Sequence, residues 1–178
     1  MITGHVMMAI TLDGFVARKD HSIDWLIKQN TSGEDYGYDG FEAGIDVIVM
    51  GSGSFRTVLG FGEWPYKKPV VVLTSSMTTA DIPANLQGKV ELSNLPPTEI
   101  MALLENRGCK RVYVDGGAVV QSFLRDGLVL DMRITLVPIL IGDGIRLFGN
   151  IAADIDLKLM HAKPYPSGLV STLYEVIC

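Results

Sequence analysis

Residues 47–55 read VIVMGSGSF and residues 112–118 read VYVDGGA. Each stretch opens with a short apolar run rich in β-branched residues, and unbroken apolarity of this length is typical of a strand that is buried on both faces. Glycine follows each run, and a helical pattern follows the glycine, over about residues 52–59 and 118–124. Strand, turn and helix in this order indicate βαβ units, in which helices connect parallel strands.

The same pattern extends along the chain. Residues 6–10 and 70–73 are further candidates for buried strands. Residues 98–108 have a helical pattern that follows two prolines, with Thr98 as a candidate N-cap and Gly108 at the end. Residues 132–141 form a longer strand candidate, so the pattern predicts an α/β protein with a mostly parallel sheet.

The last quarter of the chain changes character. Residues 157–162 and 169–177 are two strand candidates that flank KPYPSG at residues 163–168. Proline and glycine between two such runs predict an antiparallel hairpin that closes the sheet. No linker, repeat or low-complexity tract interrupts the chain, so we expect residues 1–178 to form one domain.

Composition limits the classes of function. The 178 residues are 48% hydrophobic and 20% charged, and 15 Lys and Arg against 20 Asp and Glu give a net charge of −5. This charge does not favour nucleic acid as a partner. Cys109 and Cys178 are far apart, the histidines are scattered and no apolar run is long enough to span a bilayer. We therefore expect a cytoplasmic protein with neither a metal site nor a membrane anchor.

The glycine turns are candidate anion sites. A turn between a strand and a helix leaves backbone N–H groups free to bind phosphate, although a single such glycine is more often only a steric requirement. Two turns at one sheet edge favour a long ligand that carries phosphate, and the hydroxyls of residues 74–76 follow a third strand. Neither turn has the Gly-x-Gly-x-x-Gly spacing or the Gly-Lys-Ser/Thr of the common nucleotide folds, and no Gly-x-Ser-x-Gly elbow is present.

Motifs in the same order resemble the dihydrofolate reductase superfamily. They are MAITLDGFVA at residues 8–17, IDWL at 23–26, VMG at 49–51 and VDGG at 114–117. Residues 122–124, 127–128 and 134–148 are more similar to the C-terminal reductase domain of the bacterial riboflavin-biosynthesis deaminase/reductase. The resemblance covers nearly the whole chain and implies a dihydrofolate reductase-like three-layer fold.

This resemblance implies an NADPH-dependent reductase. Hydride would pass to a small heterocyclic or ribosylamino-pyrimidine-like substrate, and the cofactor would lie across the C-terminal edge of the sheet. Many family members have Arg where this chain has Ser52, and guanidinium pairs with the 2′-phosphate that distinguishes NADPH, so NADH is not excluded. The resemblance implies a cofactor site made of Ala9, Val16, Gly51, Ser52, Gly53, Ser54, Thr74, Ser75, Ser76, Val114, Gly116, Gly117, Ala118 and Val119.

Reduction of a C=N bond leaves a nitrogen that must gain a proton. Alignment back from residues 49–51 places Asp35 where dihydrofolate reductases have their substrate-binding acid, on the helix before that strand. Trp25 would form a wall of the active site. The alternatives are a solvated carboxylate for Asp35 and a core position for Trp25. Asp39 falls where those enzymes place an apolar side chain, which argues against dihydrofolate as the substrate.

Three other interpretations remain open at this point. The chain could be a true dihydrofolate reductase, a module that binds the nucleotide without catalysis, or a purely structural homodimer domain. The pair Asp13-Gly14 is typical of a tight turn. The resemblance also implies a homodimer, for which residues 132–141 could supply an edge strand.

Overall fold

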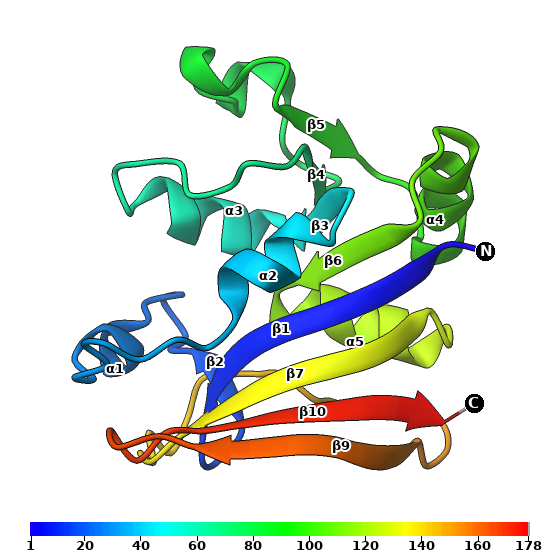
Figure 1. The fold of residues 1–178 in the computed structure, drawn as a ribbon. Helices are drawn as coiled ribbons and strands as arrows, with labels where there is room; N and C mark the ends of the chain where they lie inside the picture. Colours follow the sequence, from blue (N-terminus) through cyan, green and yellow to red (C-terminus); the bar gives the residue numbers. More distant parts are fainter. Residues whose placement is uncertain (178) are drawn as a thin grey trace.

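The computed structural model describes residues 1–177, so Cys178 lies outside the described residues. One eight-stranded sheet has the order β5-β4-β3-β6-β1-β7-β10-β9 (Figure 1). Its first six strands are parallel, β10 is antiparallel to β7 and β9 is antiparallel to β10. The strands are β1 (Thr3–Thr11), β3 (Val47–Gly51), β4 (Val70–Leu73), β5 (Val90–Ser93), β6 (Arg111–Asp115), β7 (Val129–Val137), β9 (Asp156–Pro164) and β10 (Val170–Ile177).

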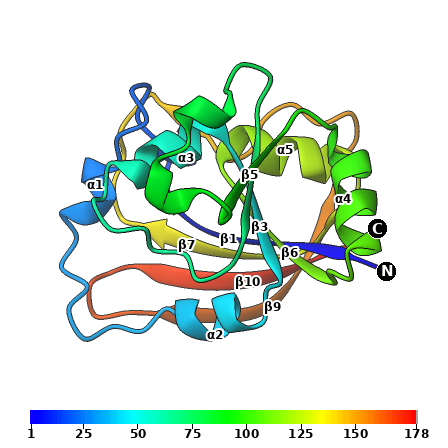
Figure 2. The ribbon, with the colours of Figure 1, turned by 90° about the horizontal axis from the view of Figure 1, so that it is seen from above.

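Helices cover both faces of this sheet. Figure 2 shows α2 on one side and α5 on the other. A second, two-stranded sheet pairs β2 (Phe15–Ala17) with β8 (Ile145–Arg146). The helices are α1 (Asp24–Ile27), α2 (Tyr38–Ala43), α3 (Ser52–Leu59), α4 (Pro97–Asn106) and α5 (Gly117–Arg125), with 3₁₀ turns η1 (Thr79–Asp81) and η2 (Ala84–Leu86).

The unbroken apolar runs are explained by the two cores. In β3, Val47 and Val49 pack into the cluster that includes α4 and α5, whereas Ile48 and Met50 pack into the cluster with residues from α2 and α3. Successive side chains of a strand point to opposite faces, so a strand with helices on both sides needs apolar residues at every position. The mostly parallel sheet and the C-terminal hairpin are thereby confirmed.

Three local expectations are wrong. β7 ends at Val137 because Pro138 follows, and the amides of Ile141 and Gly142 donate to the carboxylate of Asp13 instead of continuing a ladder. β7 also lies between β1 and β10, so it is not an edge strand. Thr98 is not a cap, because α4 begins one residue earlier at Pro97, a residue well suited to the first position of a helix.

Asp13 has the structural role that its turn sequence suggests. Its carboxylate accepts the hydroxyl of Thr11 at 2.6 Å as well as the two loop amides. These hydrogen bonds lower the pKa of Asp13, the Thr11 hydroxyl contributing most. Within residues 1–177, no helix is long and apolar enough to cross a bilayer.

Candidate active site

A cleft of about 710 Å³ lies where β1, β3 and β6 end and α3 and α5 begin. Ligands of open α/β sheets bind at this edge, beyond the carboxyl ends of the strands, and the volume is within the usual range of small-molecule sites. The cleft brings together ten of the fourteen residues predicted to bind a cofactor, namely Ala9, Val16, Gly51, Ser52, Gly53, Ser54, Gly116, Gly117, Ala118 and Val119.

The glycines of the second turn are required by close packing. Gly116 has φ +93°, which L side chains rarely adopt, and a methyl group on it would approach Ser54 Oγ to 2.5 Å. A methyl group on Gly117 would lie 2.5 Å from the carbonyl oxygen of Arg146. Because the first N–H groups of a helix have no intrahelical acceptor, the N-termini of α3 and α5 present donors and positive dipole ends to the cleft. This cradle suits a pyrophosphate.

His21 joins the same end of the cleft and was not predicted. Its φ is +66°, and its imidazole is packed on α3 so closely that a methyl group on Gly53 would lie 2.6 Å from Cε1. The hydroxyl of Thr57 donates to the His21 carbonyl at 3.2 Å, which ties the loop to the helix. No spacing in the sequence relates residues 21 and 53, so only the fold places an imidazole beside this helix start.

Four predicted cofactor residues do not line the cleft. Val114 is fully buried in the core on the α5 side of the sheet. The hydroxyl of Thr74 accepts the amides of Ser76 and Met77, both at 3.2 Å, and so closes a local turn after β4. Ser75 and Ser76 are exposed beside it. The three hydroxyl residues therefore form an ordinary turn in this structure.

Asp35 does not lie on a helix. Gly33 and Gly37 both have φ +77°, so the segment forms a loop, and α2 begins only at Tyr38. The Asp35 side chain is exposed, and its Oδ1 accepts the amide of Gly37 at 2.7 Å. Asp39 is 93% exposed and faces Lys67. Neither carboxyl lines the cleft, because the glycine-rich segment turns both toward solvent.

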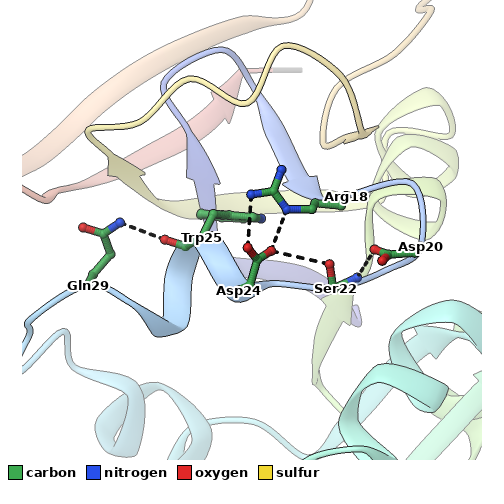
Figure 3. Close-up of polar contacts among 6 residues, drawn as sticks. All are labelled: Arg18, Asp20, Ser22, Asp24, Trp25 and Gln29. Carbon is green, nitrogen blue, oxygen red and sulfur yellow. Dashed lines mark hydrogen bonds and ion pairs between the residues drawn. The ribbon is translucent and has the colours of Figure 1, made fainter.

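Trp25 is completely buried against Val137 and Leu169. Figure 3 shows it on α1 beside the ion pair in which Arg18 donates to Asp24, with Nε at 2.6 Å from Oδ1. The ion pair holds the loop that precedes α1. Trp25 is therefore a core residue, whereas its neighbours Ile23 and Leu26 line the cleft.

Replacing Trp25 with Phe is expected to cost about 1 to 2 kcal/mol of stability through lost packing. No hydrogen bond is lost, because Nε1 has no partner within residues 1–177. Urea unfolding measures the change, and steady-state kinetics of the same variant are expected to stay within about threefold of wild type, a difference worth less than 1 kcal/mol. A large rise in KM with unchanged stability would contradict the core role.

Asp115 is the buried carboxyl of the cleft. It ends β6, is 8% exposed, and its Oδ1 lies 3.5 Å from the hydroxyl of Tyr113. Burial raises the pKa of Asp115 to about 6 from its ordinary 3.8, although the Gly116 amide and nearby tyrosine hydroxyls oppose this rise. The sequence showed this residue only as part of a phosphate-binding turn. The position of Asp115, directly before two glycines at the end of a strand, is the sequence signal that could have identified it as a candidate acid.

Three tyrosines surround this carboxyl. Tyr38 comes from α2, Tyr66 from the loop after α3, and Tyr113 from β6, where its hydroxyl donates to the carbonyl of Met7 at 2.9 Å. Burial raises the pKa of all three phenols, and the charge of Asp115 adds to the effect. The tyrosines therefore remain neutral hydrogen-bonding groups. Among the described residues, no three His, Cys, Asp or Glu side chains are grouped as metal ligands.

Comparisons with known proteins agree with this architecture. The family model of the RibD C-terminal domain matches residues 3–171. The crystal structure of a putative riboflavin biosynthesis protein from Shewanella sp. PV-4 is 34% identical, with a TM-score of 0.92, and the match covers 99% of this chain and 100% of that one.

Two more distant structures share the fold. A Thermotoga maritima diaminohydroxyphosphoribosylaminopyrimidine deaminase/5-amino-6-(5-phosphoribosylamino)uracil reductase is 16% identical over 99% of this chain and 57% of its own, with a TM-score of 0.74. Dihydrofolate reductase from Enterococcus faecalis is 14% identical over 99% and 97%, with a TM-score of 0.68. The protein belongs to the family of RibD C-terminal domains and has the dihydrofolate reductase-like fold.

Proposed function

We propose that this protein is an NADPH-dependent reductase of a small flat heterocycle, with Asp115 as the group that carries the proton. One observation supports the proposal above all. The same cleft contains two helix N-termini suited to phosphates and, beside them, a buried carboxyl whose pKa is raised to about 6. A carboxyl that is perturbed in this way in a cleft is a typical acid or base.

The cofactor would lie along the two glycine turns. The N-termini of α3 and α5 would hold its phosphates, while Ala9 and Val16 would border the nicotinamide. NADPH, when bound, supplies the hydride. Ser52, Ser54 and His21 are polar side chains at the start of α3, and His21 is the candidate partner for a 2′-phosphate in place of the family's arginine.

The reacting nitrogen of the substrate would face Asp115. In its protonated form the carboxyl donates a proton from Oδ as the nitrogen gains electron density. The hydroxyl of Tyr113 lies 3.5 Å from Oδ1 of Asp115, and its orientation is fixed by the hydrogen bond that it donates to the Met7 carbonyl. Apolar residues such as Met7 and Leu26 also line the cleft and would displace water when substrate and cofactor are bound.

A titration with NADPH and, separately, NADH tests the cofactor. Binding to the folded state alone stabilises it by about 2.7 kcal/mol at one hundred times Kd. We expect both nucleotides to raise the thermal midpoint and NADPH to do so at lower concentration. His21→Ala is expected to reduce the ratio of the Kd for NADH to the Kd for NADPH. No response to either nucleotide would contradict the proposal.

We also propose that two copies associate through the exposed edge strand β9. All nine of its residues are exposed, including Leu157, Leu159 and Met160 at 44%, 54% and 52%. Asp156, Lys158 and Lys163 share the strand with these apolar side chains, and an edge that exposes this much apolar surface is normally covered. Sedimentation equilibrium is expected to give a dimer for the wild type and a monomer for Leu159→Lys, whereas the matched change Leu140→Lys in an exposed loop leaves the dimer intact. A wild-type monomer would exclude the association.

A further inference from the structure

Glu42 is a buried carboxyl that the proposed reaction does not use. It lies on α2, is 3% exposed and is not part of the lining of the cleft. Burial of a carboxylate is costly, so such a group normally accepts hydrogen bonds that offset the cost. Oε1 of Glu42 accepts the backbone amide of Lys67 at 3.0 Å. The carboxyl thereby joins α2 to a loop segment 25 residues further along the chain.

The segment that Glu42 holds forms part of the wall around Asp115. Lys67 directly follows Tyr66, which lines the cleft. Tyr38 lines the cleft from α2 and lies one helical turn before Glu42, so both are on one face of the helix. Burial contributes most to the raised pKa of both phenols, and the negative charge of Glu42 raises it further. Glu42 therefore lies near both tyrosines without reaching the cleft itself.

The loop has few other polar contacts that could hold Tyr66. Among the described residues, the backbone groups of residues 62–66 make no hydrogen bond with one another or with the rest of the backbone. Trp64 packs edge-on against the ring of Tyr66, with the ring centroids 5.2 Å apart. The Lys67 side chain lies 4.0 Å from the carboxylate of Asp39, but this pair is exposed, and exposed ion pairs contribute little. The backbone amide of Lys67 therefore makes the contact that anchors this end of the loop to a buried group.

We infer that Glu42 is a positioning residue of the active site, which holds Tyr66 beside Asp115 and so keeps the acid buried. The inference rests on the proposed function for the role of Asp115, although the burial of this carboxyl can be measured without substrate or nucleotide. Without the contact, we expect the end of the loop to move and water to reach Asp115. Because burial is the main cause of its raised pKa, that pKa is then expected to fall from about 6 toward the ordinary 3.8.

Glu42→Leu tests the inference through a double-mutant cycle with Asp115→Asn. Leucine removes the acceptor but fills similar space with an apolar side chain, a change that folded proteins often tolerate. Thermal midpoints of the full-length protein are measured at pH 4 and pH 7 without ligand. Asp115→Asn alone is expected to raise the midpoint at pH 7 and not at pH 4, and we expect this increase to shrink by about half or more when Glu42→Leu is also present. A general loss of stability lowers both members of the pair alike, so it leaves the increase unchanged.

Two further variants separate the hydrogen bond from the charge of Glu42 and from other contacts of Lys67. Glu42→Gln keeps an oxygen that can accept from the amide, and Asp39→Asn removes an exposed carboxylate that faces the side chain of the same lysine. Both are expected to leave the full increase at pH 7. An undiminished increase in Glu42→Leu, or an equal loss in Glu42→Gln, overturns the inference. If Glu42→Leu does not fold, Glu42→Met takes its place under the same criteria, because its flexible side chain adapts to irregular space.

Binding of NADPH is scored separately. A protein that couples Glu42 to Asp115 but binds no NADPH contradicts the proposed function and supports the role of Glu42 in burying the carboxyl. A protein that binds NADPH but has no such coupling overturns the inference and leaves the proposed function standing.

Discussion

Replacing Asp115 with Asn is expected to lower kcat for reduction by about 10²- to 10³-fold, within the range of general acid catalysis. The amide has nearly the same shape as the carboxylic acid and fits beside Tyr113, but it cannot donate a proton to a substrate nitrogen. Because the group must be protonated and its pKa is about 6, kcat of the wild type is expected to fall tenfold per pH unit above that value. The variant is expected to lose this dependence.

The same substitution is expected to stabilise the fold. The pKa of Asp115 is higher in the folded chain than its ordinary 3.8, so the folded state favours the protonated form. The stability that protonation contributes is fully present below pH 3.8 and is lost as the pH rises through about 6. A difference of about two pKa units corresponds to on the order of 3 kcal/mol. Thermal midpoints of variant and wild type are therefore expected to agree near pH 4 and to diverge by pH 7, with the variant higher.

Asp126→Asn provides the matched control for Asp115→Asn. Asp126 follows α5 at the surface and touches no part of the cleft, so both kcat and the pH profile are expected to stay as in the wild type. The sequence-based assignment of Asp35 as the acid predicts instead that kcat falls more in Asp35→Asn than in Asp115→Asn. That result would contradict the assignment of Asp115 as the proton donor.

The fold could be predicted because its signals are local. Residues 47–50 of β3 and residues 112–114 of β6 form unbroken apolar runs, so the sequence alone indicates strands that are covered on both faces. The glycines after these strands mark the turns, since only a residue without Cβ fits at Gly116. Ten of the predicted cofactor residues therefore line one cleft.

The acid and the loop residues could not be predicted in the same way. The raised pKa of Asp115 comes from burial beneath α2 and the loop that carries Tyr66, and this burial depends on tertiary packing. His21 meets Gly53 only through the path of the loop before α1. The placement of Asp35 depends on a helix before β3 that includes this residue. Gly33 and Gly37, both with positive φ, make residues 33–37 a loop instead. An alignment without a gap predicts which residue type occupies a position, but it does not predict the backbone conformation or burial of that residue.

Replacing Gly117 with Ala is expected to weaken NADPH binding by about 10- to 100-fold, or about 1.4 to 2.8 kcal/mol. The added methyl group would meet the Arg146 carbonyl oxygen at 2.5 Å, and backbone atoms cannot rotate away as a side chain can. β8 would have to move off α5, which also strains the bond that Gln121 Nε2 donates to the same carbonyl at 3.0 Å. Overpacking of this kind costs about 1 to 3 kcal/mol of stability. Isothermal titration with NADPH and urea unfolding measure the two effects.

Gly40→Ala is the control for the methyl group itself. Gly40 lies inside α2, nothing is within 4 Å of the position of an added Cβ, and its φ is not positive. Alanine there is expected to stabilise the protein by about 0.5 to 1 kcal/mol and to leave NADPH affinity unchanged. Normal NADPH affinity in Gly117→Ala would show that the nucleotide does not lie over the start of α5, because a shift of β8 must move the floor of the cleft there. If the loss in NADPH binding free energy exceeds the loss in unfolding free energy, the phosphates bind on the turn at Gly116 and Gly117.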